Sequence, residues 1–318
     1  MRILVAVLSF VSSLAFAQSY PTKPVTIIVP YPAGGPTDQL ARQVSQIFTE
    51  KLGQPFVVEN ITGGNTLIAT GRVAKAAGDG YTLLLHNLQI SANVTLYPDA
   101  PYNTERDLTP VGFINRNPLV MIGRKGLPPN NLTELIPYMR EHNLNIAHPG
   151  AGATGHLATS LFLQEAKLKA TLVPYRGAAP AMQNILGEQV DLFLSTPQAV
   201  VKLVQAGRIK AYGLTTKESY PQFPNASSFV TVVSPKLEIF YWQALFAPAK
   251  TPAAIIDKLN GILQQLEDDP KVVSAWHAEG VSPFPKDERS PQAGQQVMKN
   301  EITRWRQVIQ DNHIEGPH

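Results

Sequence analysis

The 318-residue chain contains no cysteine. No disulfide can therefore stabilise it, and its stability must come from a hydrophobic core. At this length and with 44% hydrophobic residues, two such cores are more usual than one. The sequence also lacks a G-x-S-x-G nucleophile elbow and any pair of carboxylates that stands out for acid–base catalysis. These absences favour binding over catalysis.

The chain lacks a strong charge of either sign. It carries 27 basic and 24 acidic residues, a formal net charge of +3 at pH 7. No cluster of Lys and Arg provides the footprint of a nucleic-acid-binding surface. His86, His148 and His156 have neither the close spacing of metal ligands nor a supporting thiol. We therefore expect no nucleic acid, no metal and no cofactor.

Apolar runs long enough to suggest a membrane are absent, but the N-terminus carries a shorter one. Arg2 precedes the stretch ILVAVLSFVSSLAFA, which ends Ala15-Phe16-Ala17. A positive charge, a short apolar segment and an A-x-A motif are typical of a secretory signal. A membrane-spanning helix needs roughly 20 apolar residues, more than this stretch provides. We predict cleavage after Ala17, so that residues 1–17 are a signal peptide and the mature protein is exported.

Apolar runs alternate with helical patterns along the rest of the chain. VTIIVP, PFVVEN and YTLLLHN have the character of buried strands, and DQLARQVSQIFTEKLG and LIATGRVAKAAG that of helices. A second series follows from residue 145, with strands NIAHPG, TLVPYRG, VDLFLS and AYGLTT separated by helices. Such alternation predicts an α/β fold with mainly parallel strands.

Two segments depart from this alternation of strands and helices, and they predict a discontinuous domain organisation. LTPVGFINRNPLVMIGRKG suits a long strand crossing between domains, and EIFYWQALFAPAKTP resembles it and could carry the chain back. The remainder of the chain is helical. We predict one lobe from residues 18–120 and 243–318, a second lobe from residues 121–242, and a hinge at about 115–123 and 239–247.

The first strand leads directly into a glycine-rich loop in IIVPYPAGGPTDQLARQV. Gly34 and Gly35 permit a close approach to the backbone, Pro36 suits a first helical turn, and Thr37 or Asp38 can cap it. Unpaired N–H groups at a helix start bind anions without a basic side chain. The loop suits a carboxylate or phosphate, although an ordinary strand–helix turn would have the same composition.

A similar loop occurs in the second series, in NIAHPGAGATGHLATSLF. Gly150, Gly152 and Gly155 fulfil the G-x-G-x-x-G dinucleotide fingerprint. That fingerprint expects an acid at the end of the next strand, but this strand ends PYRG, with Arg176 there. We therefore favour a second anion-binding loop that faces the first across the hinge.

Several motifs together resemble the Bug family, the periplasmic solute-binding proteins of tripartite tricarboxylate transporters. They are VTIIVPYPAGGPTDQLAR, AAGDGYTLLL, PGAGATGHLATSLF, VPYRGAAPAMQNILGEQVDLF and GRIKAYGLTT, and they span nearly the whole mature chain in order. The resemblance implies a two-lobed periplasmic-binding-protein (Venus flytrap) fold, each lobe a mainly parallel sheet flanked by helices. It also implies a periplasmic location and closure of the lobes around an organic carboxylate, held largely through backbone amides and ordered waters.

The resemblance, together with the loops above, gives the candidate ligand-binding residues. The first lobe contributes Tyr31, Ala33, Gly34, Gly35, Thr37, Asp38, Asn65, His86 and Asn87. The second contributes Gly152, Ala153, Thr154, His156, Tyr175, Arg176 and Ser195.

Some of these positions depart from the family pattern and leave the ligand open. Asn65 stands in a loop that is commonly richer in glycine, His86 and Asn87 replace small polar residues, and Ser195 replaces an acid or amide. Arg176 is either a carboxylate ligand or a surface arginine, and His86 either a donor to the ligand or a structural residue. Asp191 is expected to cap or orient a neighbouring loop. Tyr31 and Tyr175 either stack on a planar ligand or cover the hinge.

The sequence thus predicts a monomeric receptor that delivers an organic mono- or dicarboxylate to the membrane components of a tripartite tricarboxylate-type transporter. Terephthalate, an aromatic dicarboxylate, and linear aliphatic diacids are both admissible ligands. The rival hypothesis is an exported hydrolase or lyase that acts on a small carboxylate in the same cleft.

Overall fold

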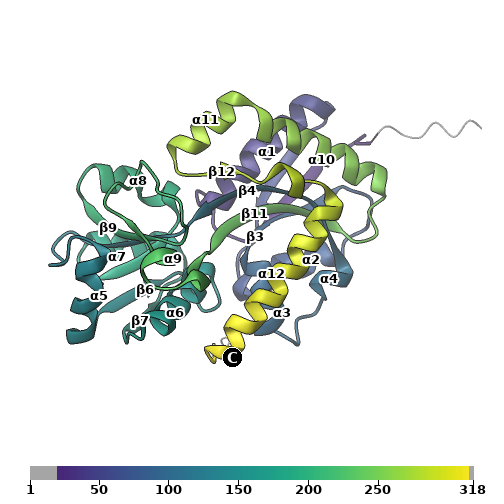
Figure 1. Ribbon diagram of the computed structural model, residues 1–318. Helices are drawn as coiled ribbons and strands as arrows, with labels where there is room; N and C mark the ends of the chain where they lie inside the picture. The colour runs from purple at the N-terminus through teal and green to yellow at the C-terminus, as the bar shows by residue number, and fades with distance from the viewer. Residues whose placement is uncertain (1–19, 315–318) are drawn as a thin grey trace, which may run out of the picture.

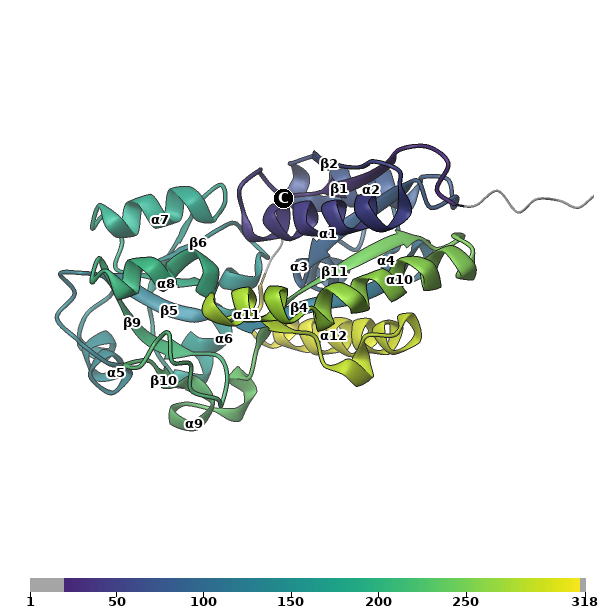
Figure 2. The ribbon, with the colours of Figure 1, turned by 90° about the horizontal axis from the view of Figure 1, so that it is seen from above.

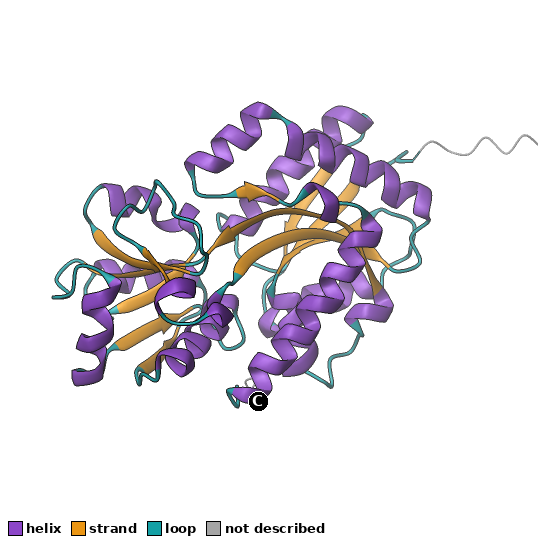
Figure 3. Cartoon of the chain, viewed as in Figure 1, coloured by secondary structure: helices purple, strands orange, loops and turns teal. Residues whose placement is uncertain are grey.

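The computed structural model describes residues 20–314, so the predicted signal peptide at 1–17 lies outside the described residues. Two α/β lobes lie side by side, each with a central sheet and helices on its outer faces (Figures 1 and 3). This confirms the predicted two-lobed fold. Among residues 20–314, no helix combines the length and the apolar character that crossing a membrane requires.

The sheet of the first lobe contains six strands in the order β12-β4-β11-β3-β1-β2. β1 pairs in parallel with β2 and β3, whereas β11 is antiparallel to β3 and β4, and β12 is antiparallel to β4. The strands are β1 (Val25–Val29), β2 (Phe56–Asn60), β3 (Thr82–Asn87), β4 (Leu108–Pro118), β11 (Phe240–Pro248) and β12 (Ser282–Pro283).

The sheet of the second lobe also has six strands, in the order β10-β9-β5-β8-β6-β7. β6 is parallel to β7 and β8, and β9 to β10, while β5 is antiparallel to its neighbours β8 and β9. The strands are β5 (Val120–Arg124), β6 (Asn145–His148), β7 (Thr171–Pro174), β8 (Leu192–Ser195), β9 (Ile209–Leu214) and β10 (Ser227–Ser228).

Helices connect the strands and cover the sheets. Seen from above, α1 and α12 lie on opposite sides of the strands β4 and β11 (Figure 2). The α-helices are α1 (Pro36–Leu52), α2 (Leu67–Ala74), α3 (Gln89–Leu96), α4 (Thr104–Asp107), α5 (Leu132–Glu141), α6 (Thr154–Ala166), α7 (Ala178–Leu186), α8 (Pro197–Gln205), α9 (Phe229–Val232), α10 (Ala253–Asp268), α11 (Pro270–Ala278) and α12 (Pro291–Asp311). The short 3-10 helices are η1 (Gly64–Thr66), η2 (Pro235–Leu237) and η3 (Lys286–Glu288).

The β1–α1 unit shows how local sequence produces these elements. The apolar side chains of β1 are buried on both faces, as in a central parallel strand. α1 follows with Leu40, Val44 and Phe48 buried at helical spacing. It ends at Gly53, whose φ of 71° provides the left-handed residue that commonly ends a helix. This unit places the predicted glycine loop at the carboxyl end of β1.

Two chain segments connect the lobes. The predicted single long strand is in fact two strands, β4 and β5, separated only by Leu119 and belonging to different sheets. Thr215 forms hydrogen bonds to both segments. Its backbone N–H donates to Leu119 O at 3.0 Å, and its hydroxyl donates to Ile239 O at 2.6 Å. Ile239, the residue before β11, in turn donates its N–H to Thr215 O at 2.9 Å. The two connections are thus bonded to one another through the second lobe.

Candidate functional site

The predicted loops all lie at the carboxyl ends of parallel strands. β1, β2 and β3 lead into α1, α2 and α3 in the first lobe, and β6, β7 and β8 lead into α6, α7 and α8 in the second. Figure 2 shows the start of α1 turned toward α7 and α8. Ligands in open α/β sheets bind in the crevice outside the carboxyl ends of such strands.

The loops of the two lobes meet across this crevice. A Cβ atom added to Gly152 would lie 2.4 Å from Cδ1 of Leu96, at the end of α3. A Cβ on Gly150 would lie 3.9 Å from Oδ1 of Asn65. The β6–α6 loop of the second lobe therefore lies against α3 and the β2–α2 loop of the first.

Helix capping differs between this crevice and the rest of the molecule. At the six helices that start at the crevice, the side chain of the N-cap residue forms no capping bond; these residues are Gly35, Thr66, Leu88, Ala153, Gly177 and Thr196. At α3 the preceding Asn87 accepts from Gln89 N at 3.0 Å through its Oδ1 atom. Side chains do cap five helices that start elsewhere, from the N-cap residues Asn103, Asn131, Ser228, Asp269 and Ser290. α10, which follows Pro252, is an uncapped helix outside the crevice. Helix N-terminal N–H groups without side-chain caps, and the positive ends of their dipoles, thus gather where the lobes meet.

Asp38 holds the β1–α1 loop in place. Its buried carboxylate accepts hydrogen bonds from Gly34 N at 2.8 Å, Asn60 Nδ2 at 3.0 Å and Arg42 Nε at 3.0 Å. Burial opposes ionisation of this carboxyl, but the bonds from Arg42, Gly34 and Asn60 lower its pKa below the ordinary 3.8. Gly34 has a φ of 85°, and a Cβ there would meet nothing within 4 Å, so the space above the loop is open. Because these three donors occupy its carboxylate, Asp38 supports the backbone of the loop from below the open space.

We expect Asp38→Asn to weaken ligand binding about tenfold and to destabilise the fold by about 1–2 kcal/mol. An amide keeps only one acceptor oxygen, and its NH2 group, a donor, would face either Asn60 Nδ2 or the Gly34 and Arg42 donors. The pKa of Asp38 is lowered, so its contribution is present above pH 3.8 and is lost as pH falls below that value. Urea unfolding at pH 7 and ligand titration measure the two effects. Asp257→Asn, at an exposed position of α10, is the matched control. Equal losses in both variants would contradict the role of Asp38.

Two polar clusters meet at the end of β3. In the first, the Tyr31 hydroxyl lies 3.4 Å from His86 Nδ1 and donates to Gln89 Oε1 at 3.2 Å. The rings of Tyr31 and His86 pack edge to face, with centroids 5.5 Å apart. His86 is fully buried, burial lowers its pKa to about 3, and its Nε2 atom has no hydrogen-bond partner among residues 20–314. His86 is therefore neutral near pH 7, with an unused polar atom.

The second cluster joins residues far apart in the sequence. Asn87 Nδ2 donates to the Tyr241 hydroxyl at 3.0 Å, and the hydroxyls of Thr37 and Tyr241 are 3.1 Å apart. All three side chains are buried. Thr37 and Asn87 were candidates from the sequence, whereas Tyr241 and Gln89 were missed, because their roles depend on contacts with distant residues.

The two histidines of the second loop stack on each other. The rings of His148 and His156 have centroids 4.3 Å apart, and Gly152 N donates to His156 Nδ1 at 3.1 Å. Burial and the neighbouring His148 lower the pKa of His156 to about 4, and burial lowers the pKa of His148 as well. Both rings are therefore neutral near pH 7. Among residues 20–314, no group of three or more His, Asp or Glu side chains is placed to hold a metal ion.

The remaining candidates lie around this loop. Gly177 N donates to Pro149 O at 3.2 Å, and Tyr175 N donates to His148 O at 2.9 Å. These bonds fix the Tyr175–Gly177 turn beside the β6–α6 loop. Arg176 is exposed, whereas Ser195 and Thr154 are buried. Among the residues that the structure describes, no hydrogen bond joins Ser195 to a histidine, so no nucleophile–base pair is formed there.

A group of amide side chains lies between α1, α8 and the crossing strands, around a cavity of about 30 Å³. Within residues 20–314, Asn115 Oδ1, Gln243 Nε2 and Gln198 Oε1 are buried without a partner. Gln198 Nε2, from the second lobe, donates to Asn117 Oδ1 at 3.4 Å. These amide side chains were not among the residues predicted from the sequence. Polar residues at alternate positions of otherwise apolar strands, as in FINRNP, are the signal that would have found it.

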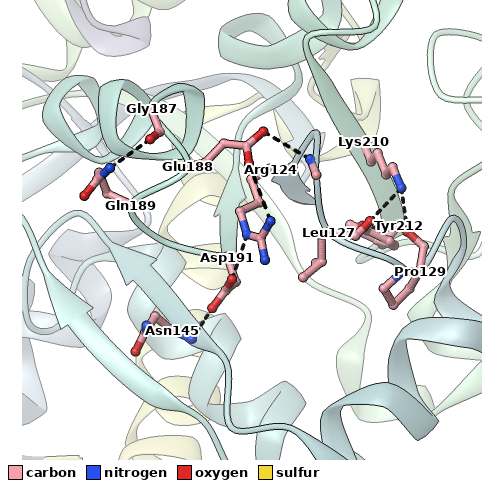
Figure 4. Close-up of polar contacts among 11 residues, drawn as sticks. Arg124, Leu127, Pro129, Asn145, Gly187, Glu188, Gln189, Asp191, Lys210 and Tyr212 are labelled. Atoms are coloured by element: carbon pink, nitrogen blue, oxygen red, sulfur yellow. Dashed lines mark hydrogen bonds and ion pairs between the residues drawn. The ribbon is translucent and has the colours of Figure 1, made fainter.

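Asp191 lies at the other end of β8 and orients neighbouring segments, as predicted. Its carboxylate accepts from Arg124 Nε at 2.9 Å and from Asn145 N at 2.9 Å (Figure 4). Glu188 adds a second carboxylate 3.6 Å from Arg124. These contacts join β5, β6 and β8 at the end of the sheet remote from Ser195.

The chain is similar to known binding proteins over most of its length. The family described as "Tripartite tricarboxylate transporter family receptor" matches residues 40–314. The structure of periplasmic binding protein BugD is 32% identical, with a TM-score of 0.86, covering 94% of this chain and 100% of BugD. MatC from Rhodopseudomonas palustris, with bound malate, is 33% identical (TM-score 0.84; 91% and 100% covered). R. palustris Rpa4515, with adipate, is 32% identical (TM-score 0.87; 94% and 100% covered).

Proposed function

This chain belongs to the tripartite tricarboxylate transporter receptor family, as its resemblance to the Bug proteins predicted, and we propose that it captures an organic dicarboxylate in the periplasm and delivers it to the membrane components of such a transporter. The observation that carries this proposal is the gathering of helix starts at the meeting edges of the two lobes, those of α1, α2, α6, α7 and α8 without a capping bond from the N-cap side chain. Such backbone groups bind carboxylates through N–H donors and helix dipoles.

Among carboxylates we favour a short aliphatic dicarboxylate over terephthalate. The related MatC and Rpa4515 structures contain malate and adipate, both aliphatic diacids. Tyr31 and His86 pack edge to face on each other, which leaves less ring surface for stacking on an aromatic guest. Two facing sets of helix starts also suit a ligand with a carboxylate at each end.

A thermal-shift screen tests the proposal, because a ligand that binds only the folded state raises the melting temperature. Malate, succinate, adipate and terephthalate are compared with butyrate as the monocarboxylate control. At a ligand concentration of 100 times Kd the stabilisation is about 2.7 kcal/mol. No shift with any carboxylate would overturn the proposal. Recovery of unchanged ligand after long incubation separates a receptor from a hydrolase or lyase.

Ligand capture requires the lobes to move, and we propose a hinge at residues 115–123 and 239–247. The lobes on either side would be residues 18–120 with 243–318, and residues 121–242. The bonds of Thr215 to Leu119 and Ile239 support this assignment, because they hold both connections to one point of the second lobe. Trp242, in β11, is expected to change its fluorescence on ligand binding. We further propose a monomer, which light scattering with and without ligand would test.

Arg176 is proposed as a contact from the second lobe to one ligand carboxylate. Arg176 is exposed and lies on the turn that is held beside the β6–α6 loop. Its guanidinium can therefore form a charge-assisted bond to the ligand when the lobes close. We expect Arg176→Ala to weaken binding about tenfold while leaving the melting temperature of the ligand-free protein unchanged. Arg208→Ala, at an exposed turn of the same lobe, is the control. An unchanged titration curve for Arg176→Ala would remove Arg176 from the site.

A further inference from the structure

A second cavity, of about 190 Å³, lies where the crossing strands pass beneath α12. Its walls include Arg116 of β4, Phe240 and Trp242 of β11, Phe284, Glu288, and Arg304 of α12. We call it the hinge pocket. Figure 1 shows α12 lying in front of these strands. Since a buried water needs only about 10–15 Å³ of such volume, the pocket has room for a small organic molecule.

The hinge pocket is separate from the candidate ligand site. In the β4–β11 pairing, Trp242 lies opposite Arg116, and Tyr241 lies opposite Asn117. Successive residues of a strand point to opposite faces of a sheet. Arg116 and Trp242 therefore share one face, and Tyr241, which contacts Thr37, lies on the other. A ligand between the lobes does not fill the hinge pocket.

The positive groups of the hinge pocket are two arginines. The guanidinium carbon of Arg116 lies 4.4 Å from the ring centroid of Phe240, and such stacking leaves the in-plane N–H donors available. Arg304 donates to the backbone carbonyl of Glu238. Among residues 20–314, neither arginine forms an ion pair with a carboxylate. Both guanidinium groups are therefore available to donate hydrogen bonds to the carboxylate of a ligand.

The negative groups are two glutamates. One oxygen of Glu301 accepts hydrogen bonds from the indole N–H groups of Trp242 at 2.8 Å and Trp305 at 3.2 Å, which fixes its position. Glu288 forms no ion pair within the described residues. Two arginines and two glutamates give a lining of zero net charge. A free dianion would meet both carboxylates, whereas a molecule with one charge of each sign can match the arginines and the glutamates at once.

We propose that the hinge pocket binds a small zwitterion with an apolar body, of the class of apolar α-amino acids. Its carboxylate pairs with Arg116 and Arg304, and its ammonium group faces Glu288 and Glu301. Its side chain packs on the aromatic rings of Phe240, Trp242 and Phe284. Because β4 and β11 connect the lobes, such a ligand acts at a point where closure changes the geometry, and the two sites influence each other reciprocally.

A matched series of probes tests the ligand class by isothermal titration calorimetry on the purified protein. L-leucine has both charges, 4-methylpentanoate lacks the ammonium group, and 3-methylbutylamine lacks the carboxylate. We expect saturable leucine binding at one site, and at least about tenfold weaker binding of each analogue, as for loss of one charge-assisted contact. The absence of leucine binding would overturn the proposal, and so would 4-methylpentanoate binding as tightly as leucine.

Variants and an indole NMR signal locate the site. Arg116→Gln and Glu288→Gln are each expected to weaken leucine binding at least about tenfold, whereas Arg306→Gln, at an exposed position of α12, retains it. Leucine is expected to shift the indole N–H resonance of Trp242 and not that of Trp276, which bonds Gln43 on the other side of the sheet. Melting curves verify that each variant is folded. An unshifted Trp242 resonance, or leucine binding that survives both pocket substitutions, would overturn the assignment.

Discussion

Gly152→Val is expected to weaken ligand binding by at least about 100-fold, which corresponds to about 2.7 kcal/mol of binding free energy. Gly152 is buried with a φ of 73°, and an added Cβ would lie 2.4 Å from Leu96 Cδ1 of the opposite lobe. A methyl group could displace the end of a leucine side chain, but the branched valine adds two further carbons beside a Leu96 that is only 8% exposed. Separation of the lobes relieves this overlap, and separation also moves the loops of the second lobe away from a ligand held by the first.

Two further variants isolate the contact between the lobes. Gly207→Val shares the backbone cost, because Gly207 has a φ of 63°, but a Cβ there would meet nothing within 4 Å. It is expected to retain ligand affinity. Leu96→Ala combined with Gly152→Val is expected to restore much of the binding, because it removes the obstructing carbons. Ligand titration measures affinity, and small-angle scattering measures lobe separation. Failure of the double variant to recover would show that Gly152 acts through its own backbone and not through Leu96.

The strand–glycine–helix pattern was enough to locate the candidate loops from sequence. Gly34 and Gly150 each follow an apolar strand and precede a helix, and local patterning of this kind does not depend on distant residues. The connections between lobes were also visible, because the alternation of apolar runs changes at both places. The break at Leu119, which divides the predicted single strand into β4 and β5, was not visible, since both halves are equally apolar.

Other features depend on contacts that no local pattern encodes. α3 was missed because Gln89, Ser91 and Asn93 are buried beside its apolar residues, so the helix shows no polar face. The absence of side-chain caps at the crevice is a property of geometry, since Thr66 and Thr196 are suitable capping residues that do not cap. Tyr241 joins the candidate site only because β11 returns beside β3.

Glu267→Gln is expected to stabilise the fold by about 3–4 kcal/mol at pH 7, since each unit of pKa shift corresponds to about 1.4 kcal/mol and pH 7 lies well above the ordinary pKa of 4.5. Glu267, on α10, is 1% exposed, and neither of its carboxyl oxygens has a hydrogen-bond partner among the described residues. Burial raises its pKa from 4.5 to about 9, despite the opposing effect of Arg289. Arg289 Nε lies 3.4 Å from Glu267 Oε2 but donates to Phe284 O at 2.6 Å, and its Nη1 bonds Asp268 at 2.9 Å. Arg289 therefore donates its hydrogen bonds to Phe284 and Asp268. The cost of burying a charge on Glu267 outweighs the attraction of that charge to Arg289.

The pH dependence distinguishes this explanation from an ordinary ion pair. A carboxyl whose pKa is raised in the folded state costs nothing below its unfolded pKa of 4.5 and lowers stability as pH rises toward about 9. The difference in unfolding free energy between Glu267→Gln and the parent should therefore be near zero at pH 4.5. It should grow by about 1.4 kcal/mol per pH unit above that value. Urea unfolding at several pH values measures it, and titration of the buried histidines cancels in the comparison. Glu279→Gln, at an exposed position, should show no such trend. A variant less stable than the parent at pH 7 would mean that Glu267 is ionised and paired with Arg289.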